Sequence, residues 1–376
     1  MQTQPLKNKK IICTVTNDLY RDGRMIRICS ALTGYGADVC LTGFKTGKSL
    51  PLTQQKFDQK RFNLIFTKGV LFYLEYNLRL FIFLLTHNFD IVNSVDTDTV
   101  LAGYLASKIK RKKVVFDAHE FFTGLPELEN KRIKSKIWTI LEKYILRRIK
   151  NNYTVSESLK ELYENKTGQK YAVIKNLPPK SRYILKPDFP SPVNIDKNKE
   201  LIVYAGVLNS GRGLESSIKM MKYFDDNKHL LIIGNGYLEK KLKNLVIELE
   251  LQEKVSFTGW VDFDIIPYLI KDAVIGLNLL DGNFTNYKVS LANKVFDYIH
   301  LGIPCLTMDF VEYRKLQNNC NCLLLTDTLN PEKNYKIINS FLEDKTKQDN
   351  TKLNAIKASE NLVWDKEKEK LLTIYQ

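Results

Sequence analysis

The chain has 376 residues, of which 44% are hydrophobic and 26% are charged. This length suits two domains of ordinary size, and this composition is typical of a soluble globular protein. The six cysteines and four histidines are scattered without a metal-ligand spacing, and we recognise no signal peptide before the first expected strand. These features argue against a disulfide framework or a zinc site and favour reduced thiols in the cytoplasm.

The positive charge of the chain is confined to its first half. Residues 1–180 contain 31 Lys and Arg against 16 Asp and Glu, a balance of +15, whereas residues 181–376 contain 26 of each, a balance of zero. A basic half predicts a polyanionic partner, which can be an acidic membrane surface, a lipid diphosphate or nucleic acid. No zinc finger, RNA-recognition signature or helix-turn-helix pattern is present, so nucleic acid is the least favoured of the three.

The first elements predict a doubly wound parallel sheet. An apolar strand over residues 10–16, a helix over 25–34 and a second strand over 37–42 form a β-α-β unit. The turn between the first strand and the helix carries Gly23 at the carboxyl edge of the expected sheet. Ligands bind at that edge in open α/β sheets, and we take Gly23 as a candidate binding residue.

The most apolar segment is residues 70–86, which is interrupted by Glu75, Asn77 and Arg79. It is slightly short for a membrane-spanning helix, and its charges make one unlikely to form. We expect a core helix of the first domain. The alternative is a helix whose aromatic side, with Phe72, Tyr73 and Tyr76, contacts lipid or a lipid-linked acceptor.

Acidic residues follow two later strands of the first half. Asp96 and Asp98 come after a strand over 90–95 and lead directly into a helix, so we interpret them as helix-capping residues and expect no metal. A strand beginning at Lys113 delivers Asp117, His119 and Glu120 to the carboxyl edge of the sheet. A histidine there can bind a sugar hydroxyl or transfer a proton near neutral pH.

A basic amphipathic helix over residues 131–150 supplies much of the positive charge. Its charges are either simply solvated or dock the protein on an anionic membrane, and the sequence leaves both interpretations open. A linker follows, marked by prolines at positions 178, 179, 187, 190 and 192.

The second half begins a new β-α series with a strand over 201–206. Arg212 lies at the following loop-to-helix junction, where an arginine can bind a phosphate through two parallel hydrogen bonds. Gly234 belongs to a Gly-Asn-Gly turn after the next strand, and such a turn mostly permits a sharp change of direction. Further strands are expected over 255–261 and 273–279.

The segment 290–304 predicts a short helix with both ends marked. Ser290 is a suitable N-cap, Gly302 suits a left-handed residue after the last turn, and Pro304 prevents continuation. The start of this helix and Lys294 can bind a phosphate, and Asp297 can accept two hydrogen bonds from a ribose diol. The simpler interpretation is an amphipathic helix whose Lys294 and Asp297 form a surface pair.

The run Asn293–Phe310, together with the loop around Arg212 and the Asp-x-His-Glu element ending at Glu120, resembles family 4 glycosyltransferases with the GT-B fold. The resemblance implies that Asp297 holds the donor ribose and that His119 lies against the donor sugar and the acceptor. It also implies that Gly23 and Arg212 approach the diphosphate and that the backbone near Val261 passes the base. Val289 stands where the family has the first of two glutamates, and Val207 where it often has a cation.

We therefore expect two doubly wound Rossmann-like α/β domains that face each other across a cleft with the active site, and a C-terminal helix that crosses back to the first domain. The expected boundaries are 1–180 for the acceptor-side domain, 181–355 for the nucleotide-sugar domain and 356–376 for the crossing helix, anchored by Trp364 and Leu371. Arg212, Lys294 and the helix start at Ser290 would stabilise the departing nucleoside diphosphate without a metal or cofactor. Gly23, Gly234 and Val261 complete the candidate donor-binding set, and His119 and Asp297 are the candidate catalytic residues.

The expected function is transfer of a sugar, with retention at the anomeric carbon, from a nucleotide-sugar to a lipid-linked or cell-surface glycan. The expected location is the inner face of the cytoplasmic membrane, reached through the basic first half. Two alternatives remain open: a catalytically inactive subunit that binds a nucleotide or glycan, and another GT-B enzyme such as a nucleotide-sugar epimerase.

Overall fold

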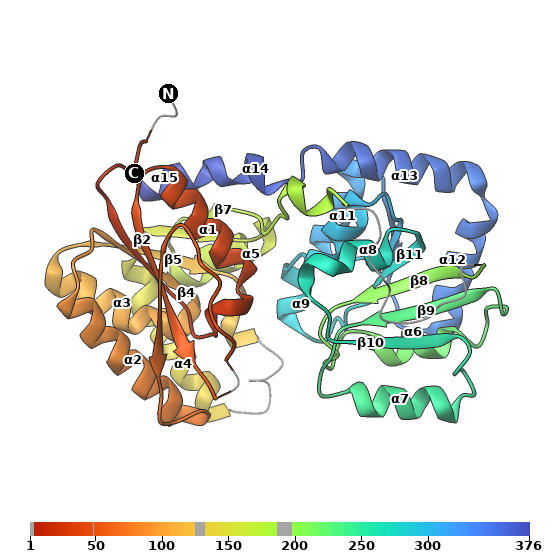
Figure 1. Ribbon diagram of the computed structural model, residues 1–376, viewed down its shortest axis with the longest axis horizontal. Coiled ribbons are helices and arrows are strands. Elements are labelled where there is room, and N and C mark those ends of the chain that lie inside the picture. Colours follow the sequence, from red (N-terminus) through yellow and green to blue (C-terminus); the bar gives the residue numbers. More distant parts are fainter. Residues whose placement is uncertain (1–3, 48, 125–131, 186–197) are drawn as a thin grey trace. The chain divides into compact units, whose positions relative to one another are not determined.

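The computed structural model describes residues 4–47, 49–124, 132–185 and 198–376, and the chain divides into two compact units (Figure 1). The first unit comprises Met1–Asn176 together with Glu367–Gln376, and the second comprises Leu177–Lys366. Lys131, where the basic helix was expected to begin, and the expected linker prolines at 187, 190 and 192 lie outside the described residues.

The first unit is built on a seven-stranded sheet in the order β3-β2-β1-β4-β5-β6-β7, in which every neighbouring pair is parallel. The strands are β1 (Lys10–Thr14), β2 (Asp38–Lys45), β3 (Asp58–Asn63), β4 (Ile91–Val95), β5 (Lys113–Ala118), β6 (Asn151–Thr154) and β7 (Ala172–Val173). The strand order reverses between β1 and β4, so the residues that follow these strands lie at the position where doubly wound sheets bind ligands.

Helices lie on both faces of this sheet (Figure 1). They are α1 (Gly23–Gly34), α2 (Gly69–Thr86), α3 (Asp96–Lys110), α4 (Arg132–Ile145) and α5 (Glu157–Thr167). The C-terminal residues also pack into this unit, because the Tyr375 hydroxyl lies 3.2 Å from that of Tyr153 and Lys113 Nζ donates to the Ile374 carbonyl oxygen at 2.6 Å.

The second unit contains a six-stranded sheet in the order β10-β9-β8-β11-β12-β13, in which every neighbouring pair is again parallel. Its strands are β8 (Glu200–Ala205), β9 (Lys228–Ile233), β10 (Val255–Gly259), β11 (Ala273–Asn278), β12 (Cys305–Met308) and β13 (Leu323–Thr326). Its helices are α6 (Leu214–Met220), α7 (Glu239–Glu248), α8 (Ile266–Ile270), α9 (Thr285–Val289), α10 (Asn293–His300), α11 (Val311–Cys320), α12 (Pro331–Glu343), α13 (Lys345–Ser359) and the first residues of α14 (Trp364–Glu367).

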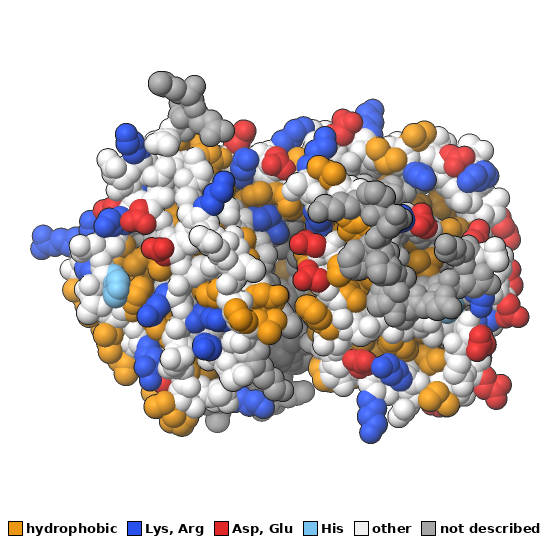
Figure 2. Space-filling view, viewed as in Figure 1, with side chains coloured by type: hydrophobic (Ala, Val, Ile, Leu, Met, Phe, Trp, Pro, Cys, Tyr) orange, Lys and Arg blue, Asp and Glu red, His pale blue; other side chains and the backbone are white. Residues whose placement is uncertain are grey.

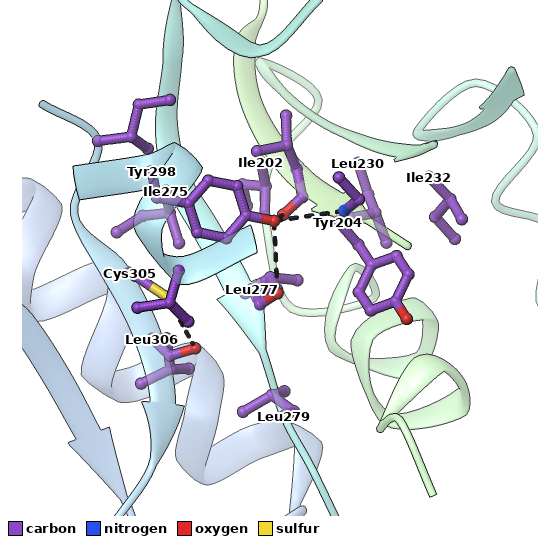
Figure 3. Close-up of a cluster of buried hydrophobic side chains, with 14 of the residues drawn as sticks. Ile202, Tyr204, Leu230, Ile232, Ile275, Leu277, Leu279, Tyr298, Cys305 and Leu306 are labelled. Carbon is purple, nitrogen blue, oxygen red and sulfur yellow. Dashed lines mark hydrogen bonds between the residues drawn. The ribbon is translucent and has the colours of Figure 1, made fainter. Parts of the chain in front are cut away.

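Tyr298 fixes α10 against this sheet (Figure 3). Its fully buried hydroxyl donates to the Val203 carbonyl oxygen at 3.2 Å and accepts the N–H of Ala205 at 3.3 Å. A Cβ at Gly276 would lie 2.5 Å from the Tyr298 ring, so the strand can pass beneath the ring only as glycine. The side chains on the opposite side of α10 are thereby held in a defined orientation.

The expected fold class, with two parallel-sheet α/β domains, is confirmed. The expected crossing helix over 356–376 is not one continuous helix: α13 ends at Ser359, and α14 is followed by a 3-10 helix (Lys368–Leu371) and α15 (Leu372–Tyr375). Leu371 is fully buried in the first unit, whereas Trp364 belongs to the second, where its N–H donates to the Pro178 carbonyl oxygen.

The expectation of a core helix at residues 70–86 is confirmed for one side of α2, whose Tyr76, Leu80 and Leu84 belong to a hydrophobic core cluster, whereas the alternative of an outward aromatic side is wrong. Helix α2 buries only Phe72, Tyr76, Leu80 and Leu84, one residue per turn, so it is not enclosed in the core. The aromatic side is the inward one, since Phe72 stacks on Tyr76 and both contact Phe44. The outward side is aliphatic instead.

Candidate functional site

The second unit brings two candidate phosphate-binding cations, Arg212 and Lys294, to the region beside Tyr204. Lys294 is the second residue of α10, and its Nζ lies 3.5 Å from the centre of the Tyr204 ring at the end of β8. Arg212 interacts electrostatically with both Lys294 and Tyr204. Residues 82 positions apart in the sequence thus place two positive charges together.

The Lys294 ammonium is buried and lacks a hydrogen-bond partner among the described residues. Burial lowers the pKa of Lys294 well below its ordinary value, and the positive charge of Arg212 lowers it further. The Tyr204 ring provides a cation–π contact but no acceptor for the three N–H donors. An anion at this position would supply what the protein does not.

The loops around these cations require glycine at two positions. Gly234 has φ +122°, and a Cβ there would lie 2.2 Å from the carbonyl oxygen of Gly206. Gly206, with φ +149°, lies against Lys294, because a Cβ would be 3.4 Å from its Nζ. Gly234 lets the loop after β9 approach the loop after β8, which leads to Arg212, and its assignment to donor binding stays a prediction.

For Ser290 and Val261, the structure gives no contact that points to a ligand among the described residues. The prediction that Ser290 caps the following helix is wrong: α10 begins at Asn293 with Ala292 as N-cap, and Ser290 is the C-cap of α9. The Ala292 N–H donates to the Tyr313 hydroxyl at 3.0 Å, a tertiary contact that the sequence pattern does not reveal. Val261 is half-buried just after β10. Their assignment to donor binding stays a prediction.

Asp297 is buried on α10, and Lys294 and Asp297 do not form the surface pair that was the simpler expectation. The Tyr183 hydroxyl donates to Asp297 Oδ1 at 2.5 Å, and Arg182 Nε lies 3.3 Å from the same oxygen. Both residues belong to the 3-10 helix Lys180–Tyr183. A ribose diol at Asp297 must share the carboxylate with these two groups or displace one of them.

The first unit contains a second group of polar residues at the end of β5. The Arg24 guanidinium lies 3.0 Å from Asp117 Oδ1, and His119 Nε2 lies 2.8 Å from Asp117 Oδ2. Arg24 and Asp117 are buried, whereas the His119 side chain remains partly exposed. A neutral His119 therefore donates from Nε2 and presents Nδ1 as an acceptor, the form required of a proton acceptor.

The charges of this group set its protonation. Although burial opposes it, the Asp117 carboxylate raises the pKa of His119 above its ordinary value. Burial also opposes ionisation of Asp117, but the neighbouring Arg24 and His119 hold the pKa of that carboxyl below its usual range. His119 thus titrates above an ordinary histidine, beside a carboxylate that stays ionised.

Asp96 and Asp98 support this group and do not cap α3. The N-cap of α3 is Val95, and Asp96 has the left-handed φ of +55°. Asp96 Oδ1 accepts the His119 N–H at 2.8 Å and the Glu120 N–H at 3.4 Å. Asp98 accepts a hydrogen bond from Thr16, and burial raises its pKa to about 6. The predicted helix start is confirmed, since Asp96 and Asp98 both lie in the first turn of α3, but neither is its N-cap; Asp96 instead holds the turn that carries His119.

Gly23 is the first residue of α1, after its N-cap Asp22. A Cβ at Gly23 would meet only Arg27 Nη1, at 3.4 Å, so the backbone does not require glycine there. The close approach of a ligand at Gly23 stays a prediction. Among the described residues, no group of three or more His, Cys, Asp or Glu side chains is arranged to hold a metal ion.

Sequence reasoning missed Arg24, Arg182, Tyr183 and Tyr204, and it missed the contact of Asp96 with the His119 turn. Each acts through a residue distant in the chain, so no local motif marks it. A buried charge in a helix face, such as Arg24 among Met25 and Ile28, is the one signal that was available.

Comparison with known proteins identifies both units. Residues 24–177 match the family model described as Glycosyltransferase Family 4, and residues 186–358 match the model described as Glycosyl transferases group 1. A stretch of 124 residues is 32% identical to the O-antigen chain mannosyltransferase RfbU of Salmonella typhimurium. That match spans 32% of each chain, about a third of the relative's length.

Solved structures resemble the whole chain. Sucrose-phosphate synthase from Thermosynechococcus elongatus has a TM-score of 0.82 at 13% identity, covering 98% of both chains. Anabaena HepE in complex with UDP has a TM-score of 0.73 at 15% identity, covering 96% of this chain and 98% of that one. At these identities the likeness shows the fold.

Proposed function

Because the chain belongs to the family 4 and group 1 glycosyltransferases and has the GT-B fold, we propose that it transfers a sugar from a nucleotide-sugar donor with retention at the anomeric carbon. The observation that carries this proposal is Lys294, a buried lysine whose Nζ has no hydrogen-bond partner in the described part of the chain and which lies beside a second basic residue, Arg212. A nucleoside diphosphate is the part of such a donor that matches two adjacent positive charges.

In this proposal the second unit binds the donor. Arg212 and Lys294 stabilise the negative charge that develops on the departing diphosphate, and no metal or other cofactor is needed. Asp297 accepts hydrogen bonds from the ribose, and Gly234, Val261 and Ser290 line the nucleotide. Gly23 and His119, in the first unit, are proposed to serve the same reaction, His119 through Nδ1 as a proton acceptor.

The proposed acceptor is a lipid-linked or cell-surface glycan, and the proposed location is the inner face of the cytoplasmic membrane. Two observations support this: the +15 charge balance of residues 1–180 and the partial match to an O-antigen mannosyltransferase. Anionic headgroups attract such a surface.

Val289, at the position of the family's first glutamate, keeps an inactive binding subunit as a second candidate. The test has two stages. A melting screen with UDP, GDP, ADP and dTDP identifies the base, since a ligand of the native state raises its stability. The corresponding nucleotide-sugars are then incubated with and without glycan acceptors. Product that requires an acceptor supports transfer, affinity without product indicates a binder, and conversion without an acceptor indicates an epimerase.

A further inference from the structure

Helix α2 has two apolar sides, of which one is exposed. Its outward side carries Leu71, Leu74, Leu78 and Ile82, at spacings of three and four residues, and each is between 53% and 64% exposed. In the described part of the chain, α2 is also the helix whose length and composition would permit membrane crossing, and 22% of this helix is buried in the protein. Monomeric proteins rarely expose a contiguous apolar row of this kind without a partner.

Helix α3 extends the exposed row. Lys110 Nζ donates to the carbonyl oxygens of Leu84, Leu85 and His87, which fixes the end of α3 beside the end of α2. Leu105 and Ile109, one turn apart on α3, are 41% and 62% exposed. We call the surface formed by Leu71, Leu74, Leu78, Ile82, Leu105 and Ile109 the α2 face.

The border of the α2 face is basic. Lys68 precedes α2, and Lys108 and Arg111 lie at the end of α3; all three are exposed. The neighbouring carboxylates are already engaged: Glu75 accepts the N–H groups of Ile65 and Phe66 and pairs with Arg79, while Asp90 pairs with Lys112. Figure 2 shows hydrophobic side chains with Lys and Arg among them on the side of the first unit where Figure 1 places α2 and α3.

We propose that the α2 face is the surface through which the protein rests on an anionic lipid bilayer. The aliphatic row would enter the boundary between headgroups and acyl chains, and the bordering cations would contact lipid phosphates. Helix α2 cannot span the bilayer in this arrangement, because its other side packs into the core through Tyr76 and Leu80. A second copy of the chain is a poorer occupant, since a two-fold contact through this face would bring the two basic borders together.

This inference rests on the membrane location proposed above, and it assigns that location to one face. The test uses the full chain and vesicles with about one-third phosphatidylglycerol in phosphatidylcholine, with pure phosphatidylcholine vesicles as reference. The variant is Leu74→Ser with Leu78→Ser, and the control is Leu353→Ser on α13, which matches Leu74 at 64% exposure. The double variant should partition about tenfold less onto the anionic vesicles than the wild type does, and the control should partition as the wild type does.

Added salt should weaken binding of the wild type to the vesicles but not abolish it. The binding that remains at high salt should be absent in the double variant. Unchanged partition of a folded double variant would overturn the α2 face while leaving the membrane location in place. Absence of wild-type binding to anionic vesicles would overturn both, and a concentration-dependent dimer abolished by the double variant would assign the face to a second copy. The nucleotide-induced melting shift should be the same in all variants, which separates these outcomes from failure of donor binding.

Discussion

Burial of Lys294 lowers the stability of the free protein, and the proposed function gives a reason for this burial. A buried ammonium without a hydrogen-bond acceptor destabilises the free protein, and it is retained beside Arg212, which repels it. Such an arrangement becomes favourable when a diphosphate supplies the missing acceptors. Its depressed pKa also makes donor binding sensitive to pH.

We predict that nucleoside diphosphate binding is accompanied by proton uptake at Lys294. The bound anion raises the lowered pKa of this lysine, so above the free-protein pKa a proton is taken up and affinity falls as pH rises. Calorimetric titration in buffers of different ionisation enthalpy measures this proton uptake. The titration is done at a pH about two units above the second phosphate pKa of the nucleotide, which is about 6, so that the ligand itself is fully ionised. Lys294→Arg is the matched control, because arginine stays charged and should bind without uptake. Equal uptake by this variant would contradict the prediction.

His119 should affect turnover rather than binding. In His119→Gln we expect turnover to fall by about a hundredfold or more, while nucleotide affinity changes little, because the loss is of a positioned proton acceptor. His87→Gln provides the control, since His87 is an exposed histidine of the same unit. Wild-type turnover in His119→Gln would remove this residue from the chemistry.

Arg24 should contribute to stability through Asp117. Arg24→Met removes the guanidinium from the buried Asp117 carboxylate and leaves His119 and the Tyr153 hydroxyl beside it, and we expect the free energy of unfolding of the first unit to fall by about 3–5 kcal/mol. The pKa of His119 should rise, because the repulsion from Arg24 is removed. Urea unfolding and NMR titration measure the two effects, and Arg27→Met on the same helix is the control. A stability loss without a change in the His119 pKa would mean that Arg24 acts on packing alone.

At the level of elements, the sequence predicted the alternation of strands and helices well because buried parallel strands are short apolar runs. It also placed Gly302 correctly as a left-handed residue after α10, with φ +68°. It failed where a distant group decides the local structure. The Tyr313 hydroxyl binds the Ala292 N–H and helps set the start of α10, and inward packing of Tyr76 determines which side of α2 is exposed. Apolar character alone could not tell the two sides of α2 apart.

The candidate site was predictable to the extent that it follows strand ends. Asp117 and His119 lie at the end of β5 in the first sheet, and Arg212 follows β8 in the second, so each residue lies at the carboxyl edge of its own sheet. Tyr183 on Asp297 and Asp96 on the His119 turn could not be foreseen, since each contact joins segments more than twenty residues apart.

The loops that follow β8 and β9 contact each other at Gly206 and Gly234, and this contact can be tested by substitution. In Gly234→Ala the new Cβ would lie 2.2 Å from the Gly206 carbonyl oxygen, so the loop beside Lys294 must move and nucleotide affinity should fall together with stability. Gly34→Ala on α1 is the control, because a Cβ there meets nothing within 4 Å. Isothermal titration and thermal melting check both effects; normal affinity in Gly234→Ala would mean that this loop is not part of the donor site.

For the whole molecule, the two units have separate sheets, and the end of the chain contributes to the first. Leu371, Ile374 and Tyr375 are buried there, and burial of such side chains stabilises by about 1.5–3 kcal/mol each. The net charge is divided in the same way, with a balance of +15 in residues 1–180 and a balance of zero in residues 181–376. Our proposals therefore place membrane attachment on the first unit and donor binding on the second.

The central claim, that Lys294 is retained for a diphosphate, is tested most directly by melting Lys294→Met with and without the nucleotide found in the screen. Methionine fills the same space without a buried amine, so the free variant should melt about 2–6 °C above wild type. Adding the nucleotide should raise the melting temperature of the wild type and of the exposed-lysine control Lys357→Ala, and should leave Lys294→Met unchanged. A Lys294→Met protein that melts below wild type and still shows the full nucleotide shift would contradict the account.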